Sequence, residues 1–98
     1  KEVIVMSSLP IPPDVYFSDF AFDLKCYSVV RNDIVVCQYS GLDNTENRKS
    51  YVHFQLPCDI KVGDSLECNG DCFIVTKVDF DTFDGQKALL KAFIIQKI

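Results

Sequence analysis

Apolar residues recur in short runs along the chain, and polar turn signals separate these runs. Residues 56–75 carry the strongest pattern, in which a short strand leads to Asn69-Gly70 and a second strand rich in β-branched and aromatic residues follows. Asn and Gly adopt positive φ at low cost, so this dipeptide between two strands is a strong hairpin signal. We therefore predict a β-hairpin here, with Gly70 at positive φ.

A second hairpin is predicted earlier in the chain. Residues 24–30 and 34–40 flank the polar interruption Arg31-Asn32-Asp33, which has the length of a hairpin loop. Cys26 and Cys37 lie near opposite ends of these two strands, so they could face each other across the pair. We interpret both as small core residues rather than as a disulfide.

The second half of the chain also favours strands. Residues 50–56 alternate cleanly between an apolar and a polar face, and His53 lies on the polar one. Residues 88–98, which follow an Asp84-Gly85 turn signal, fit either an amphipathic helix or a last strand. We favour the strand, because it could pair with residues 73–79. The expected core comprises the apolar residues that recur on strand faces: Val52, Phe54, Leu66, Phe73, Val75 and Val78.

The N-terminal third is less regular. Residues 2–6 predict a first strand, and the prolines that follow it predict a stiff extended arm over residues 9–13. Residues 15–22 hold closely spaced aromatic residues with imperfect alternation, which predicts a strand buried on both faces, although a one-turn helix is an open alternative. We favour an arm that simply crosses one end of the barrel. It is also a candidate contact for a partner, through Pro10, Pro12 and Pro13.

Residues 41–49, GLDNTENRK, form the most hydrophilic stretch of the chain and predict a projecting loop. Loops on a rigid β-scaffold often carry binding function. The core does not need such a loop, so deleting residues 43–48 is expected to leave the thermal midpoint nearly unchanged. An edge strand at residues 2–6 or 88–95 would supply a second contact. The predicted partner-binding residues of the loop are Asp43, Asn44, Glu46, Asn47, Arg48 and Lys49.

Composition narrows the class of protein. The 98 residues are 48% hydrophobic and carry a net charge of −4, which predicts one globular domain over residues 1–98 and disfavours nucleic acid as a partner. The apolar runs are too short to span a bilayer, and no signal peptide is apparent. Five cysteines, an odd number without framework spacing, favour a reducing compartment, so we expect the cytoplasm. We predict an all-β fold, a single small β-barrel or sandwich of about six to eight mostly antiparallel strands.

The chemistry-bearing residues do not form a convincing reactive site. A group of soft ligands lacks the Cys-x-x-Cys spacing usual in zinc sites. An acidic turn before Gly85 resembles a calcium loop, but Leu90 stands where an EF-hand needs its bidentate Glu. The single histidine has no nucleophile elbow to serve. We therefore predict no catalytic residue, metal or cofactor. The residues considered for zinc are His53, Cys58, Cys68 and Cys72, and those considered for calcium are Asp79, Asp81 and Asp84.

A stacking platform for nucleic acid is the main alternative to a protein partner. Tyr39 and Tyr51 could lie on the surface beside Arg48 and Lys49, as in an oligonucleotide-binding barrel. Nearby acidic residues dilute these few basic groups, so the acidic balance favours the protein partner.

The pattern Val62-Gly63-Asp64-x-Leu66-x-Cys68-Asn69-Gly70-x-x-Phe73-x-Val75 resembles a hairpin of small β-barrel proteins at the head-to-tail junctions and in the tails of tailed bacteriophages. The resemblance covers about residues 59–95, and the motif also occurs in unrelated SH3-like barrels. It implies a ring-forming structural subunit whose loops and terminal arms contact its neighbours. The resemblance also implies a virion as a second expected location beside the cytoplasm. We therefore expect a non-enzymatic structural or protein-interaction subunit, in a homo-oligomeric ring or beside other structural proteins. An oligonucleotide-binding barrel and a small zinc- or cysteine-dependent enzyme are the alternatives.

Overall fold

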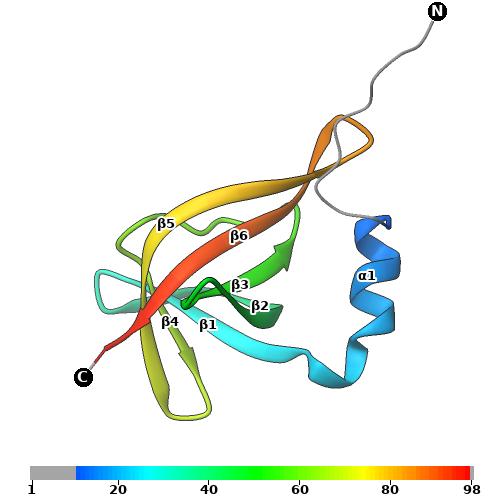
Figure 1. Ribbon diagram of the computed structural model, residues 1–98. Coiled ribbons are helices and arrows are strands. Elements are labelled where there is room, and N and C mark those ends of the chain that lie inside the picture. The colour runs from blue at the N-terminus through cyan, green and yellow to red at the C-terminus, as the bar shows by residue number, and fades with distance from the viewer. Residues whose placement is uncertain (1–10, 98) are drawn as a thin grey trace, which may run out of the picture.

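The chain folds into a closed antiparallel β-barrel, as the computed structural model shows for residues 11–97, the part that it describes (Figure 1). Within these residues, six strands are hydrogen-bonded in the order β1-β2-β3-β6-β5-β4, and β4 closes the barrel against β1. The prediction of a small all-β barrel is thus confirmed. The elements are α1 (Pro13–Asp19), the 3₁₀ turn η1 (Ala21–Asp23), β1 (Lys25–Arg31), β2 (Ile34–Glu46), β3 (Lys49–Gln55), β4 (Ser65–Cys68), β5 (Asp71–Phe83) and β6 (Gln86–Gln96).

Two-residue turns join the consecutive strands of each hairpin. In the described residues there are four such turns, at Asn32-Asp33, Asn47-Arg48, Asn69-Gly70 and Asp84-Gly85, and both residues of each have positive φ. This is the type I′ geometry, whose twist matches that of the flanking strands. The predicted hairpins at residues 24–40 and 56–75 are confirmed, and Gly70 has the expected positive φ, at 85°.

The prediction of a projecting loop at residues 41–49 is wrong. Strand β2 continues to Glu46, the turn is only Asn47-Arg48, and β3 begins at Lys49. Asp43 pairs with Val52 and Glu46 pairs with Lys49. The backbone of a polar segment can join a sheet while its side chains remain in solvent, and residues 43–50 are indeed exposed. A deletion of residues 43–48 would remove residues that pair in the sheet, so the thermal midpoint is no longer expected to stay unchanged.

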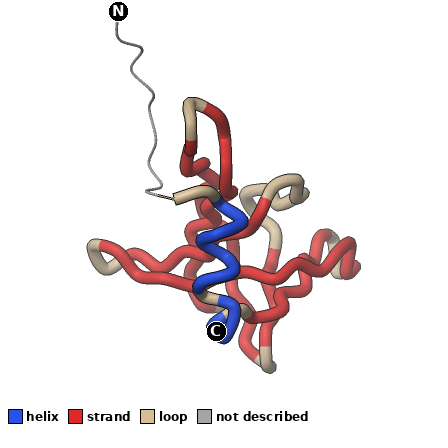
Figure 2. The backbone as a smooth tube through the Cα atoms, turned by 90° about the vertical axis from the view of Figure 1, so that its right-hand side faces the viewer, coloured by secondary structure: helices blue, strands red, loops and turns tan. Residues whose placement is uncertain are grey.

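The aromatic stretch at residues 15–22 is helical rather than extended. Pro13 lies in the first turn of α1, where a missing N–H costs nothing. The extended arm predicted for Pro13 is therefore wrong, whereas Pro12 keeps an extended backbone with φ −58° and ψ 149°. Pro10 and the strand predicted at residues 2–6 lie outside the described residues. Figure 2, which looks onto the side that carries α1, shows the helix running across the strands.

Apolar residues pack both inside the barrel and beneath α1. Inside, Phe54 and Leu66 have no exposed surface, and Val52 and Val75 are buried with them, which confirms four of the predicted core residues. Phe73 and Val78 are only partly buried, although they pack against this core. On the outer face, Phe17 of α1 covers Leu42 of β2 and Leu89 of β6. The barrel wall is thus buried on both sides where the helix crosses it.

Strand β6 confirms the favoured prediction for residues 88–98, up to Gln96. It pairs with β5 along most of its length, as expected, but it also pairs with β3 from Ser50↔Ile94 to Gln55↔Leu89. Both of its edges are therefore occupied in this region. The prediction that residues 88–95 form a free edge strand for a partner is wrong, because closing the barrel uses that edge.

An ion pair holds the β3–β4 connection against the barrel. Arg31, the last residue of β1, donates from Nε to Asp64 Oδ1 at 2.8 Å and from Nη2 to Asp64 Oδ2 at 2.7 Å. The Lys61 amide donates to the same carboxylate at 2.8 Å. Asp64 is 3% exposed, and its two-pronged contact with the guanidinium holds its pKa below the usual value.

The cysteines do not match their predicted arrangement. Cys26 pairs with Ser40, and Cys37 pairs with Val29, so the two cysteines do not face each other. Cys26 is exposed rather than a core residue, and Cys37 is half-buried. All five cysteines lie in the described residues and are free thiols. Among the described residues, no helix has the length and apolar character needed to cross a bilayer.

Candidate interaction groove

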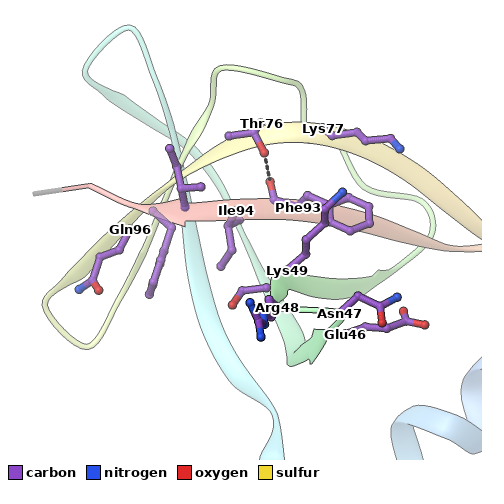
Figure 3. Close-up of a pocket in the computed structure, with 12 residues that line it drawn as sticks. Glu46, Asn47, Arg48, Lys49, Thr76, Lys77, Phe93, Ile94 and Gln96 are labelled. Atoms are coloured by element: carbon purple, nitrogen blue, oxygen red, sulfur yellow. Dashed lines mark hydrogen bonds between the residues drawn. The ribbon is translucent and has the colours of Figure 1, made fainter.

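A groove of about 770 Å³ runs along the outside of the barrel, between the β2–β3 turn and the strands β5 and β6 (Figure 3). The register Ser50↔Ile94 places the turn beside the C-terminal end of β6. Thr76 donates a hydrogen bond from Oγ1 to the Phe93 carbonyl at 3.3 Å, which ties the two strands together at the groove. The lining residues are Glu46, Asn47, Arg48, Lys49, Ser50, Phe73, Thr76, Lys77, Phe93, Ile94, Ile95 and Gln96.

The floor of the groove is apolar and its rim is mainly cationic. Phe93 is half-buried, and the Lys77 ammonium lies 5.4 Å from its ring centroid, within the range of a cation–π contact. Ile95 is 58% exposed. Arg48 and Lys49 stand on the opposite rim, where Glu46 is the one acidic group among the lining residues. A chain with a net charge of −4 therefore presents a local cationic surface here.

The groove contains part of the predicted contact segment. Glu46, Asn47, Arg48 and Lys49 line it, but as a strand end and a tight turn instead of a loop. Asp43 and Asn44 do not line it. They lie farther back along β2, where Asp43 accepts a hydrogen bond from Lys25 at 3.0 Å.

Sequence reasoning missed the other wall, which Phe73, Thr76, Lys77, Phe93 and Ile95 supply. A weak signal for it exists in the sequence of β6. Apolar residues there occupy both faces of the strand, and Phe93 and Ile95 share the outer face with Lys91. This pattern could have indicated that something covers the outer face, but not which segment lies opposite.

A buried polar cluster surrounds His53 on the outer side of β3, beneath α1. The Tyr16 hydroxyl lies 3.1 Å from His53 Nδ1, and Asp81 forms a short hydrogen bond with His53 Nε2. The Tyr51 ring packs edge-on against the imidazole, with 5.0 Å between centroids. Burial lowers the pKa of His53, although the Asp81 carboxylate acts in the opposite direction. Burial also raises the pKa of Tyr16.

A carboxylate, an imidazole and a hydroxyl in series can move protons, as acid–base catalysts do. In this chain His53 lies on the strand face opposite Val52 and Phe54, as predicted, but it is only 4% exposed because Tyr16 of α1 packs over it. The two tyrosine rings and α1 leave little of it within reach of a substrate. The arrangement fits a structural role, in which Tyr16 fixes α1 to the barrel through His53 and Asp81.

The residues weighed for metal binding are not brought together. His53 lies on the outer face of the barrel wall, whereas Cys68 belongs to the interior core. Burial raises the pKa of the Cys58 thiol to about 11, which keeps it in the protonated form that binds metals poorly. Asp81 is bonded to His53, and Asp84 lies in the β5–β6 turn. Within residues 11–97, no cluster of three or more His, Cys, Asp or Glu side chains could hold a metal ion.

The predicted stacking platform is not present in the form expected. Tyr51 is 6% exposed, because it packs against Phe93 and Lys91. Tyr39 is half-buried, and its hydroxyl accepts a hydrogen bond from the Asp59 amide at 2.9 Å. Arg48 and Lys49 instead share the groove with Phe93.

Fold and site together define a small closed antiparallel β-barrel that carries a surface groove with an apolar floor and a cationic rim. No protein-family model matches the chain, and no curated protein or solved structure resembles it at a significant level.

Proposed function

We propose that this chain is a non-enzymatic structural or protein-interaction subunit of a larger assembly, and that it contacts a neighbouring subunit through the groove. One observation carries the proposal: Ile95 leaves apolar surface uncovered on a groove floor that cationic side chains surround. The barrel core is complete without Ile95, whose side chain lies on the outer face. An apolar centre inside a polar rim is the usual anatomy of a protein interface.

The assembly that we propose is a virion, at the head-to-tail junction or in the tail of a tailed bacteriophage. The hairpin pattern of residues 62–75 supports this, because it resembles that of small barrels from such structures. The partners would be further copies in a homo-oligomeric ring or adjacent structural proteins. A location in the cytoplasm or in the virion, without a membrane partner, follows from the same proposal.

The mass of the native assembly tests the proposal, together with a pair of matched variants. Ile95→Glu places a negative charge on the groove floor, and Val62→Glu does the same at a side chain of similar exposure, 62% against 58%, outside the groove. We expect Ile95→Glu to reduce the mass of the assembly recovered from the native source, and Val62→Glu to leave it unchanged. Equal masses for all three proteins would exclude the groove as the contact.

Single-stranded nucleic acid is the second candidate partner, and the composition of the rim favours it. Arg48, Lys49 and Lys77 surround Phe93, and a basic groove with an aromatic ring is how single strands are held. Fluorescence anisotropy of a labelled oligonucleotide tests this candidate. Binding that falls steeply with salt and is lost in Phe93→Leu would support it over a protein partner. Anisotropy that stays flat at low salt would eliminate it.

A further inference from the structure

We propose that the groove receives the 19–23 corner of a second copy of this chain, with Phe22 as the anchor. The inference rests on the proposed function and names the partner. Its starting point is η1, the 3₁₀ turn between α1 and β1, where Phe22 is 103% exposed. Phe20, the residue just before η1, is 46% exposed. Asp19 and Asp23, both exposed, flank these two rings. An aromatic ring of this kind is a typical anchor residue at protein interfaces.

The groove suits this corner in size and in polarity. Its volume of about 770 Å³ is sufficient for an aromatic side chain with its flanking residues. Phe93 and Phe73 offer the apolar and aromatic surface against which a phenyl ring packs favourably.

The groove also complements the corner in charge. Lys77 and Arg48 stand on the rim, where carboxylates that flank an inserted ring would meet them. The corner contributes Asp19 and Asp23, so its sign is opposite to that of the rim. Two copies with a net charge of −4 each repel one another in most orientations. Docking a cationic groove on an acidic corner removes this repulsion at one place and selects that orientation.

The corner and the groove are different surfaces of one molecule. Figure 1 places η1 at the foot of α1, while the C-terminal end of β6 lies on the other side of the barrel. A contact between unlike surfaces is heterologous. Repeated from copy to copy, it closes into a ring or continues as a filament, according to the rotation between neighbours. A reciprocal dimer with two such contacts is the smallest closed form.

A mixing experiment with the full chain tests the inference by sedimentation velocity over a range of concentrations. Phe22→Ser removes the anchor from a fully exposed position and leaves the groove intact, whereas Ile95→Glu alters the groove and leaves the anchor intact. We expect the wild type to self-associate, each variant alone to be monomeric, and an equimolar mixture to form a one-to-one dimer. In that mixture only one docking contact is possible, between the intact Phe22 anchor of the Ile95→Glu variant and the intact groove of the Phe22→Ser variant. Lys77→Glu, at an exposed rim position, serves as a second groove variant if Ile95→Glu fails to fold.

Charge reversal adds an independent arm. Asp23→Lys is expected to weaken association at least tenfold, and Asp23→Lys combined with Lys77→Glu to recover most of it. Val36→Ser, at an apolar side chain with 45% exposure outside both surfaces, is the matched control and should associate as the wild type does.

The outcomes separate this inference from the proposed function. A wild type that remains monomeric at every concentration overturns self-association, and so does a Phe22→Ser variant that associates normally. The proposed function stands in either case if a different structural subunit still binds the chain in an Ile95-dependent manner. The proposed function is refuted as well if the native assembly that contains the Ile95→Glu variant has the same mass as the wild-type assembly.

Discussion

Gly41→Ala is expected to destabilise the barrel, because β2 passes close over the core at this residue. Gly41 is buried and pairs with both Lys25 and Phe54. A Cβ atom added there would lie 2.6 Å from Val52 Cγ1 and 2.8 Å from Phe54 Cε1. Carbon atoms in contact prefer about 3.5–4.0 Å, so the overlap is on the order of 1 Å. Val52 and Phe54 have no exposed surface and therefore no free space in which to move.

Overpacking of this kind typically costs about 1–3 kcal/mol in the free energy of unfolding. The backbone of Gly41 does not lie in the positive-φ region, so the cost arises from space rather than from conformation. Urea denaturation followed by circular dichroism measures the effect as a lower midpoint with an unchanged slope. Ser40→Ala, at an exposed neighbouring position, is the control and should stay within about 0.5 kcal/mol of the wild type.

A double-mutant cycle identifies the origin of the loss. Val52→Ala removes the methyl group that a new Cβ at position 41 would meet first. The double variant should therefore be less destabilised than the sum of the two single variants. A midpoint for Gly41→Ala equal to that of the wild type would refute the reasoning. Residue 41 would then lie in an open loop, and the pairing of β2 with β3 at Phe54 would be incorrect.

Three further predictions follow from single residues. Gly70→Val should cost at least about 1 kcal/mol in the free energy of unfolding, because φ is 85° there; an unchanged urea midpoint would contradict the turn geometry. Arg31 lowers the pKa of Asp64, so the folded state binds fewer protons than the unfolded state at low pH. The pair therefore contributes its full stability above the unfolded pKa of about 3.9. This stability is lost as the pH falls through the lower pKa of the folded state. Asp64→Asn should therefore be less stable than the wild type at neutral pH and should lose less stability on acidification. Urea denaturation at several pH values measures this. The same dependence of the free energy of unfolding on pH in both proteins would argue against a role of the ion pair. His53 is the only histidine of the chain, and burial lowers its pKa, so wild-type stability should decline as pH falls below about 6.5. His53→Gln should flatten the pH dependence between about pH 6.5 and 5, and a decline of the same size in the variant would assign it to another group.

The sequence predicted the strands wherever the signals were local. Alternating polarity marked β3, and Asn69-Gly70 and Asp84-Gly85 marked their turns, because these residues adopt positive φ without help from distant contacts. Recognition of a turn from residues that favour positive φ failed at Asn47-Arg48. Arg48 has φ 66°, which no local preference of arginine favours, so the pairing of β2 with β3 must impose it. A polar strand pair was therefore predicted as a loop.

Tertiary structure alone decided the groove and the burial of His53. Whether His53 faces solvent depends on where α1 packs, and Phe17 reaches Leu42 and Leu89 only in the folded chain. Arg48 meets Phe93 because the barrel closes with the register Ser50↔Ile94, which joins strands far apart in sequence. Local patterns determine which segments are extended and which face of each is apolar. Long-range register determines which of those faces meet, because it depends on the fit of the whole closed sheet.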